Sequence, residues 1–367
     1  MFDKLFSRKG TSHPKTDIAK RFNLIGRVGQ GSMSKVWRAT DLQSGRTVAL
    51  KILEKEKTSK YESRFQGLNK PSEGEVAVSL QHPNIVKTYE FGWTLEDEMF
   101  LVMEFVEGVG LALLVDLQNE EMKRYRLRYM IQIGEALNYC HQQNWIHRDV
   151  CPRNVMIADG KLAKMIDFGL VVPNTPNFCK PGNRTGTASY MAPELIKRLT
   201  TDQRLDVFSY AVTCFEMYTR RFPWDAALTI DAVMQHINRL PIQLTDLVPN
   251  IDGQIAAAIM KGLEADPDRR WKNVSDMVAE IREAEARMVL AARKAAAQKN
   301  PPKALTAKAA SDSGSASGTN QSMPQAATAS AAEKKATEKR VAARKKSGKK
   351  NGQKSHDDVD LKEMFGD

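Results

Sequence analysis

Cysteine is scarce in this sequence, and long apolar runs are absent. The four cysteines, at positions 140, 151, 179 and 214, form no C-x-x-C pair and no zinc-binding spacing. A disulfide framework and a structural zinc site are therefore not predicted. The chain also lacks an apolar signal-peptide core near Met1 and any apolar run close to the ~18 residues that a membrane span needs. We expect a reduced, soluble, cytoplasmic protein with no transmembrane segment.

The C-terminal region has almost no large apolar residues. Residues 299–356 consist mainly of Ala, Lys, Ser, Thr, Gly and Gln, a composition that cannot bury enough area to offset the entropy lost on ordering. From Ala291 onward the chain has 16 Lys and Arg against 8 Asp and Glu, which accounts for +8 of the formal net charge of +11. We expect this basic tail (residues 291–367) to begin as a helix extension and then to be disordered. Its Lys and Arg clusters between 339 and 350 are either a contact for a polyanion such as nucleic acid or a solvated spacer.

Two polar motifs stand in the middle of the chain. Residues 147–154 read His-Arg-Asp-Val-Cys-Pro-Arg-Asn, and residues 167–169, Asp-Phe-Gly, begin thirteen residues after that Asn. Between the motifs, two short apolar pieces flank Asp159-Gly160, which is a two-residue hairpin signal. Such a hairpin brings Asn154 and Asp167 together at its outer ends. A base that orients a hydroxyl, an amide and a carboxylate that hold a metal are the groups that phosphoryl transfer needs.

These motifs, with others in a fixed order along residues 22–284, resemble the protein kinase family. Upstream lie a glycine-containing hairpin tip at 28–36 and a strand that ends at Lys51. Downstream, residues 186–194 read Gly-Thr-Ala-Ser-Tyr-Met-Ala-Pro-Glu, which is similar to the end of a kinase activation segment. The resemblance further implies that the helix beginning at Asp206 anchors the catalytic loop and that Arg270 pairs with Glu194.

The resemblance implies a bilobal, protein kinase-like α+β fold. Strand-like alternation over residues 22–105, with one helix near 65–80, predicts a small β-rich N-lobe. Helical periodicity over residues 109–284 predicts a larger C-lobe. The expected divisions are an N-terminal extension (1–21), the N-lobe (22–105), the C-lobe (106–290) and the basic tail.

By the same resemblance, the chain binds ATP between the two lobes. Gly29 and Gly31 let backbone N–H groups approach the phosphates, although Ser34 stands where the family usually has a third glycine. Residues 104–108 resemble the hinge that faces the adenine edge, and Met103 would guard the pocket behind it. The expected nucleotide-binding residues are Val28, Gly29, Gly31, Val36, Ala49, Lys51, Met103, Glu104, Val106 and Met156.

Lys51 is expected to contact the α- and β-phosphates and to be held by a glutamate on a helix. The spacing back from His82 favours Glu73, and Glu75 remains the competitor. Gly74 between them weakens the helix by roughly 1 kcal/mol relative to alanine. We therefore expect a mobile helix whose position decides whether the Lys–Glu pair forms.

The resemblance also implies the roles of the polar groups in the two motifs. Asp149 would accept the hydrogen bond of the substrate hydroxyl, and Asn154 and Asp167 would hold Mg²⁺, a hard cation suited to carboxylate, amide and phosphate oxygens. The expected catalytic residues are Asp149, Lys51, Glu73 and Arg153.

The catalytic loop departs from the usual Ser/Thr kinase pattern at one position. Cys151 stands where those kinases carry lysine, and Arg153 follows two residues later, as in many tyrosine kinases. The activation segment nevertheless has the Ser/Thr form. We therefore expect Arg153 to supply the missing cation and the acceptors to be Ser and Thr of protein substrates, with a tyrosine or dual-specificity kinase as an alternative.

A second functional class remains open, a kinase-like binding or scaffold module that acts through the fold or the basic tail. Inactive relatives usually lack at least one of the groups that hold the nucleotide, the metal or the substrate. The presence of all these groups in this chain favours the active enzyme. They are Lys51, Glu73, Asp149, Asn154 and Asp167.

Regulation is also expected to depart from the family pattern. Four residues before Thr187, where kinases often carry the activating phosphate, this chain has Asn183. The switch is therefore expected at Thr185 or Thr175, or else it is not phosphorylation of the activation segment.

Overall fold

The structure, a computed structural model, describes residues 13–30, 33–182, 185–224 and 239–299. The chain divides at Ala292 into two units, and residues 293–299 are the described part of the second. Gly31 and Asn183 lie outside the described residues, as does the basic tail beyond residue 299, so the expected disorder of that tail stays a prediction.

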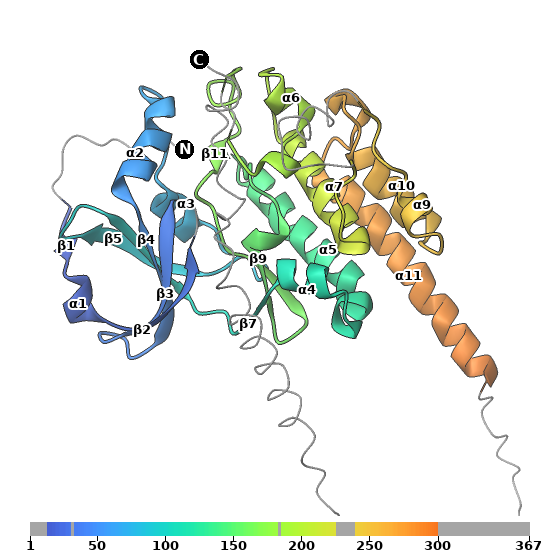
Figure 1. Cartoon of the computed structure of the whole chain (residues 1–367), viewed down its shortest axis with the longest axis horizontal. Helices are drawn as coiled ribbons and strands as arrows, with labels where there is room; N and C mark the ends of the chain where they lie inside the picture. The colour runs from blue at the N-terminus through green and yellow to red at the C-terminus, as the bar shows by residue number, and fades with distance from the viewer. Residues whose placement is uncertain (1–12, 31–32, 183–184, 225–238, 300–367) are drawn as a thin grey trace, which may run out of the picture. The chain divides into compact units, whose positions relative to one another are not determined.

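A six-stranded sheet forms the core of the N-lobe (Figure 1). Its order is β1-β5-β6-β4-β3-β2, and all neighbours are antiparallel except β1 and β5. Strand β6 is buried at five of its six positions, which fits a central strand covered on both faces. The strands are β1 (Lys15–Thr16), β2 (Phe22–Gln30), β3 (Ser34–Asp41), β4 (Thr47–Leu53), β5 (Thr88–Thr94) and β6 (Met99–Glu104).

Short helices accompany this sheet, and one of them carries the candidate site glutamate. That helix, α3, begins with a capping box in which Ser72 Oγ accepts from Glu75 N at 3.3 Å and Glu75 Oε2 accepts from Ser72 N at 2.8 Å. Glu75 is thus committed to starting the helix. The helices are α1 (Ile18–Arg21), α2 (Lys55–Glu62), the 3₁₀ turn η1 (Ser63–Phe65) and α3 (Glu73–Ser79).

The described part of the N-terminal extension, residues 13–21, adds a strand to the N-lobe sheet. Strand β1 pairs in parallel with the outer edge of β5, aligning Lys15 with Trp93. His13 stacks on the Trp93 ring with centroids 5.6 Å apart, and Lys15 Nζ lies 2.7 Å from the Asp97 carboxylate. These contacts cover an edge that β5 would otherwise expose.

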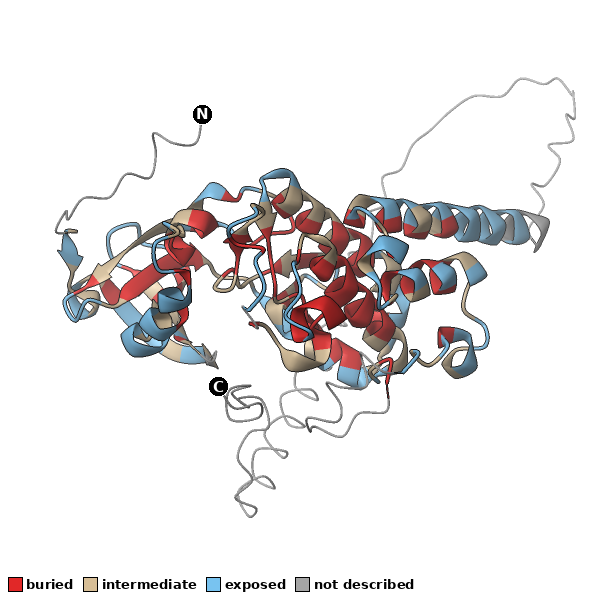
Figure 2. Cartoon of the chain, turned by 90° about the horizontal axis from the view of Figure 1, so that it is seen from above, coloured by how far each residue is buried: buried red, intermediate tan, exposed pale blue. Residues whose placement is uncertain are grey.

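Helices dominate the C-lobe, and α5 and α7 form its centre. Helix α7 is buried along almost its whole length, and Tyr210 on it donates to the Met130 carbonyl of α5 at 2.7 Å. Figure 2 shows the buried residues concentrated in this helical part. The helices and 3₁₀ turns are α4 (Leu111–Leu117), α5 (Glu120–Gln142), η2 (Pro152–Asn154), η3 (Ala188–Tyr190), α6 (Pro193–Ile196), α7 (Arg204–Thr219), α9 (Leu244–Leu247), α10 (Gly253–Gly262), η4 (Pro267–Arg269) and α11 (Val274–Lys299).

Short strands of the C-lobe place the metal-binding candidates. A hairpin is present with Asp159 and Gly160 both at positive φ (48° and 64°). Its register pairs Ala158 with Leu162, so three residues connect the strands and not the predicted two. At its open end Ile166 N donates to Asn154 O at 3.0 Å, so Asn154 and Asp167 emerge side by side. The strands are β7 (Gly108–Gly110), β8 (Trp145–Ile146), β9 (Val155–Ala158), β10 (Leu162–Met165) and β11 (Val172–Pro173).

Candidate active site

Lys51 lies between two carboxylates from different parts of the chain. Its Nζ is 2.5 Å from Glu73 Oε1 and 2.8 Å from Asp167 Oδ1. Burial by itself would lower the pKa of Lys51, but the charges of Asp167 and Glu73 outweigh it and raise that pKa above its usual value. Burial would likewise raise the pKa of Asp167, yet the Lys51 charge holds it below its usual value. Lys51 is therefore a fixed cation, and Asp167 is a carboxylate ready to bind a metal.

The choice between Glu73 and Glu75 is decided by the start of α3. Glu75 caps the helix, whereas Glu73 reaches Lys51 with only 8% of its surface exposed. Gly74 has a packing role that sequence reasoning missed. A Cβ at Gly74 would lie 2.4 Å from Cγ of Phe91 on β5, so only glycine lets α3 approach the sheet this closely.

Asp149 is held by hydrogen bonds on both carboxylate oxygens. Asn154 Nδ2 donates to Oδ2 at 2.8 Å and to the Asp149 carbonyl at 2.9 Å. Thr187 donates to Oδ1 from its backbone N at 2.9 Å and from its hydroxyl at 2.7 Å. The Thr187 contact was not predicted, and it joins the activation segment directly to the catalytic loop.

Asp206 on α7 anchors the backbone of the catalytic loop. Its carboxylate accepts from the backbone N of His147 at 2.7 Å and of Arg148 at 2.8 Å, and it lies 2.9 Å from His141 Nε2. Arg148 has a φ of 68°, a left-handed conformation that is costly for a residue with a side chain. The two backbone hydrogen bonds hold that conformation, as the expected anchoring role of Asp206 implies.

Asn154 and Asp167 fit a magnesium ion that also binds phosphate. The Asn154 amide nitrogen is used by Asp149, which leaves its amide oxygen as a donor to a cation. Asp167 Oδ1 accepts from Lys51 and from Gly169 N at 3.0 Å, so Oδ2 is the oxygen that remains for the metal. Within the described residues there is no cluster of three or more His, Cys, Asp or Glu that could hold a metal ion by protein groups alone. Mg²⁺ suits such a sparse oxygen site because phosphate and water complete its coordination.

The expected nucleotide-binding residues occupy adjacent positions on the sheet and the hinge. In the strand registers Val36 pairs with Lys51 and Ala49 pairs with Met103. Met103 is 6% exposed, as a residue behind the pocket should be. Gly29 pairs with Val36 at the start of the glycine-containing turn.

The remaining expected pocket residues come from both lobes. Val28 is exposed on β2, Val106 packs partly buried after β6, and Met156 pairs with Gly110 in the C-lobe sheet. The Glu104 side chain accepts from Lys87 N at 2.8 Å and Lys164 Nζ at 2.6 Å. Those bonds tie the hinge to both lobes, and Glu104 N also donates to the Lys87 carbonyl at 2.8 Å.

Arg153 and Cys151 differ sharply in their surroundings. Cys151 is 1% exposed, and burial raises the pKa of its thiol to about 12, so it is a packing residue. Arg153 is exposed, and its Nη2 lies 3.5 Å from Thr187 Oγ1, beside the Asp149 carboxylate. Of the two, Arg153 is therefore the side chain that lies beside Thr187, as its expected role would require.

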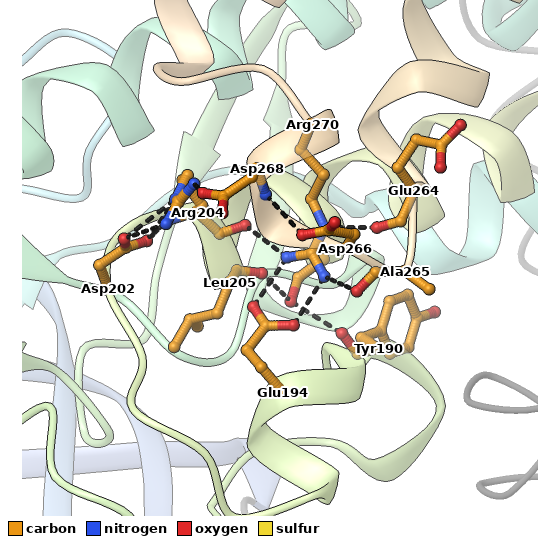
Figure 3. A network of polar contacts seen from close by, with 11 residues as sticks. Tyr190, Glu194, Asp202, Arg204, Leu205, Glu264, Ala265, Asp266, Asp268 and Arg270 are labelled. Atoms are coloured by element: carbon orange, nitrogen blue, oxygen red, sulfur yellow. Dashed lines mark hydrogen bonds and ion pairs between the residues drawn. The ribbon is translucent and has the colours of Figure 1, made fainter.

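The expected pair between Arg270 and Glu194 is present (Figure 3). Arg270 Nη1 and Nη2 lie 2.7 and 2.6 Å from the two Glu194 carboxylate oxygens, and the pair is almost fully buried. Arg270 also donates to the backbone oxygens of Glu264 and Ala265 at 2.6 and 3.0 Å. This network fixes the end of the activation segment against the base of the C-lobe.

Comparison with known proteins agrees with this geometry. The family model for the protein kinase domain matches residues 22–283. The serine/threonine-protein kinase PknB of Mycolicibacterium smegmatis is 30% identical over 275 residues, covering 72% of this chain and 43% of the relative. The serine/threonine-protein kinase PrkC of Bacillus subtilis is 28% identical, covering 73% of this chain and 41% of the relative. A probable serine/threonine-protein kinase of Clostridium acetobutylicum is 28% identical over 72% of this chain and 40% of the relative.

The match covers only part of each of these relatives. This chain spans about two fifths of the length of the curated relatives that it matches. In addition, no helix among the described residues is long and apolar enough to cross a membrane.

Proposed function

This chain belongs to the protein kinase domain family, and from that premise we propose that it transfers the γ-phosphoryl group of ATP to Ser and Thr hydroxyls of protein substrates. The observation that carries the proposal is the position of Lys51 between Glu73 and Asp167. The β9–β10 hairpin brings Asp167 next to Asn154, and Asn154 contacts Asp149. An inactive scaffold would have no need to keep this arrangement complete.

Lys51, Asn154 and Asp167 position and neutralise the nucleotide. Lys51 is held rigidly by Glu73, so its charge stays directed at the phosphates. A Mg²⁺ ion held there would supply positive charge that offsets the charge developing on the phosphates during transfer. Asn154 and Asp167 would supply its protein ligands through the amide oxygen and Oδ2.

Asp149 orients the attacking hydroxyl. Its Oδ1 accepts two hydrogen bonds from Thr187, whereas Oδ2 accepts one from Asn154. Because each carboxylate oxygen has two lone pairs, Oδ2 is the atom with capacity for the substrate O–H. Asp149 Oδ2 then receives the proton as the new O–P bond forms.

Arg153 would supply the cation that Cys151 cannot, although its place in the loop is the one that many tyrosine kinases use. Its position beside Thr187 and Asp149 lets the guanidinium approach the transferred phosphoryl group. The support for Ser and Thr as acceptors comes from Thr187, since it belongs to the activation-segment form that the resemblance associates with those acceptors. A tyrosine or dual-specificity kinase remains the alternative.

The test is phosphate transfer by the full chain, supplied with ATP and Mg²⁺ and a peptide library. We expect phosphoserine and phosphothreonine on phosphoamino-acid analysis. The matched control is Lys51→Met, which removes the cation and should show no transfer. Equal transfer by Lys51→Met would refute a kinase mechanism, and a product dominated by phosphotyrosine would overturn the acceptor assignment.

A further inference from the structure

Arg148, the residue before Asp149, is a buried cation with unused hydrogen-bonding capacity. It is 3% exposed, and its Nη2 donates to the Phe178 carbonyl at 2.8 Å. Its Nε and Nη1 have no hydrogen-bond partner within the part of the chain that the structure describes. A phosphate on the activation segment is the usual partner for such a cation.

Thr185, one of the two expected phosphate acceptors on this segment, is poorly placed to be modified. Thr185 is only 7% exposed, so its hydroxyl is not accessible to another kinase in this arrangement. The carbonyl of Thr175, the other candidate, accepts from Phe178 N at 3.0 Å and Cys179 N at 3.1 Å. The segment around Thr175 and Phe178 is therefore already folded without a phosphate.

Two aromatic side chains upstream of α3 hold the segment instead. Tyr61 on α2 donates its hydroxyl to the Leu170 carbonyl at 3.1 Å, immediately after the Asp-Phe-Gly motif. Phe65 on η1 packs on Phe178 with ring centroids 5.8 Å apart, and it also contacts the Tyr61 ring at 5.4 Å. Both side chains are buried, with 6% and 3% of their surface exposed.

Charges around these rings favour the same arrangement. Burial raises the pKa of Tyr61 to about 12, and the nearby Arg148 charge and Thr185 hydroxyl offset this only in part. Tyr61 therefore stays protonated and remains a donor at neutral pH. The Lys70 ammonium lies 5.4 Å from the Tyr61 ring centre and 5.9 Å from that of Phe65, within cation–π range.

We propose that Tyr61 and Phe65, which we name the aromatic latch, are positioning residues that keep the activation segment in its catalytic arrangement without phosphorylation. Through Leu170 the latch fixes the chain next to Asp167. Through Phe178 and Arg148 it fixes the chain next to Asp149. A phosphate shifts a conformational equilibrium only when the active state is not already the populated one. The inference rests on the proposed kinase function.

The first measurement compares the full chain as isolated with the same chain treated with a Ser/Thr phosphatase and checked by mass spectrometry. Turnover of a substrate peptide should differ by less than about threefold between the two states, because the latch leaves little equilibrium for a phosphate to shift. If activity requires the phosphate, the latch proposal is wrong, and the proposed kinase function is not contradicted. Absence of transfer in both states would count against the kinase function itself.

Variants of the latch then separate positioning from general stability. Phe65→Ala should lower kcat by about tenfold or more through misplacement of the reacting groups, with little change in KM for ATP. Tyr61→Phe removes one hydrogen bond and should lower kcat by about fivefold at an unchanged melting temperature. Gln66→Ala, an exposed neighbour of Phe65, is the matched control and should behave as the parent chain.

A readout that does not need activity completes the test. Amide hydrogen exchange at Phe178 and Cys179 should be at least about tenfold faster in Phe65→Ala than in the parent chain, because local opening exposes those amides. Combining Phe65→Ala with Phe178→Ala should add little to either single change, since both remove one contact. Exchange rates equal to those of the parent, or turnover unchanged in both latch variants, would overturn the proposal.

Discussion

At the scale of single residues, Asp149 has the most constrained environment in the site. Thr187 and Asn154 donate to both carboxylate oxygens, and Oδ2 keeps a lone pair with which it would accept from the substrate hydroxyl. Asp149→Asn keeps the size of the side chain and removes the proton acceptor. We expect turnover to fall by on the order of 10²–10⁴-fold, the usual contribution of a general base. Steady-state kinetics alongside a thermal melt measures this, and wild-type turnover by the variant would contradict it.

Arg153 gives a second residue-scale prediction. Removing a cation that acts on transition-state charge should lower turnover by on the order of 10²-fold, so Arg153→Ala should be severely impaired. Arg153→Lys should retain part of the activity because it keeps the charge. Cys151→Ala is the control, since a buried thiol contributes packing and not charge. Similar, small effects of Arg153→Ala and Cys151→Ala on kcat would show that Arg153 has no such role.

The sequence predicted the residues of the site better than it predicted what holds them. Glu73 was favoured from spacing alone, and its contact with Lys51 is confirmed by the structure. Thr187 and Tyr61 were missed, because each acts on a residue far along the chain. Tyr61 meets Leu170 across 109 positions, and no local pattern encodes such a contact.

At the scale of elements, α3 shows that packing can reverse the effect on stability that helix propensity alone predicts for a residue. Gly74 suggested a weak helix, but its lack of a Cβ is what allows α3 to lie against Phe91. Gly74→Ala would stabilise an isolated helix by about 1 kcal/mol. In the protein, overpacking should cost about 1–3 kcal/mol and move Glu73 away from Lys51.

The test of α3 is a double-mutant cycle. Gly74→Ala should lower both stability and kcat, and the double variant Gly74→Ala/Phe91→Ala should recover part of the activity that Gly74→Ala loses. Urea unfolding and peptide phosphorylation measure the two effects. A Gly74→Ala chain that is more stable than the parent and fully active would mean that α3 can shift away from Phe91 at little cost. That result would agree with the mobile helix expected from the sequence.

The loop anchored on α7 gives a prediction about acid stability. Burial would raise the pKa of Asp206, but its hydrogen bonds from His141 and the loop backbone hold that pKa below its usual value. A depressed pKa means that Asp206 stabilises the fold above its unfolded pKa and that this contribution is lost as the pH falls through the folded value. Asp206→Asn should be less stable at pH 7, with a shallower loss of stability below about pH 4. Urea unfolding across pH 3–7 would reveal parallel curves if Asp206 had no such role.

At the scale of the whole molecule, the kinase domain and the basic tail are expected to separate in function. Helix α11 packs into the C-lobe up to Ala284, and its later described side chains are mostly exposed. Truncation after Gln298 should therefore leave peptide phosphorylation intact, within about twofold, because the composition of the removed residues cannot form a buried core. If the tail binds polyanions, the full chain should bind DNA or RNA with an affinity that falls steeply with salt, and truncation should abolish that binding. If the full chain binds neither DNA nor RNA, the tail is better interpreted as a solvated spacer.

The pairing of β1 with β5 has a consequence for how the protein behaves in concentrated solution. Lys15 and Thr16 pair with the outer edge of β5, which could otherwise pair with the same edge of another molecule. A chain started at Asp17 should keep its catalytic groups yet show a sedimentation profile that shifts toward larger species as concentration rises. The pairing of Lys15 and Thr16 with β5 would then decide whether this protein can be stored as separate molecules.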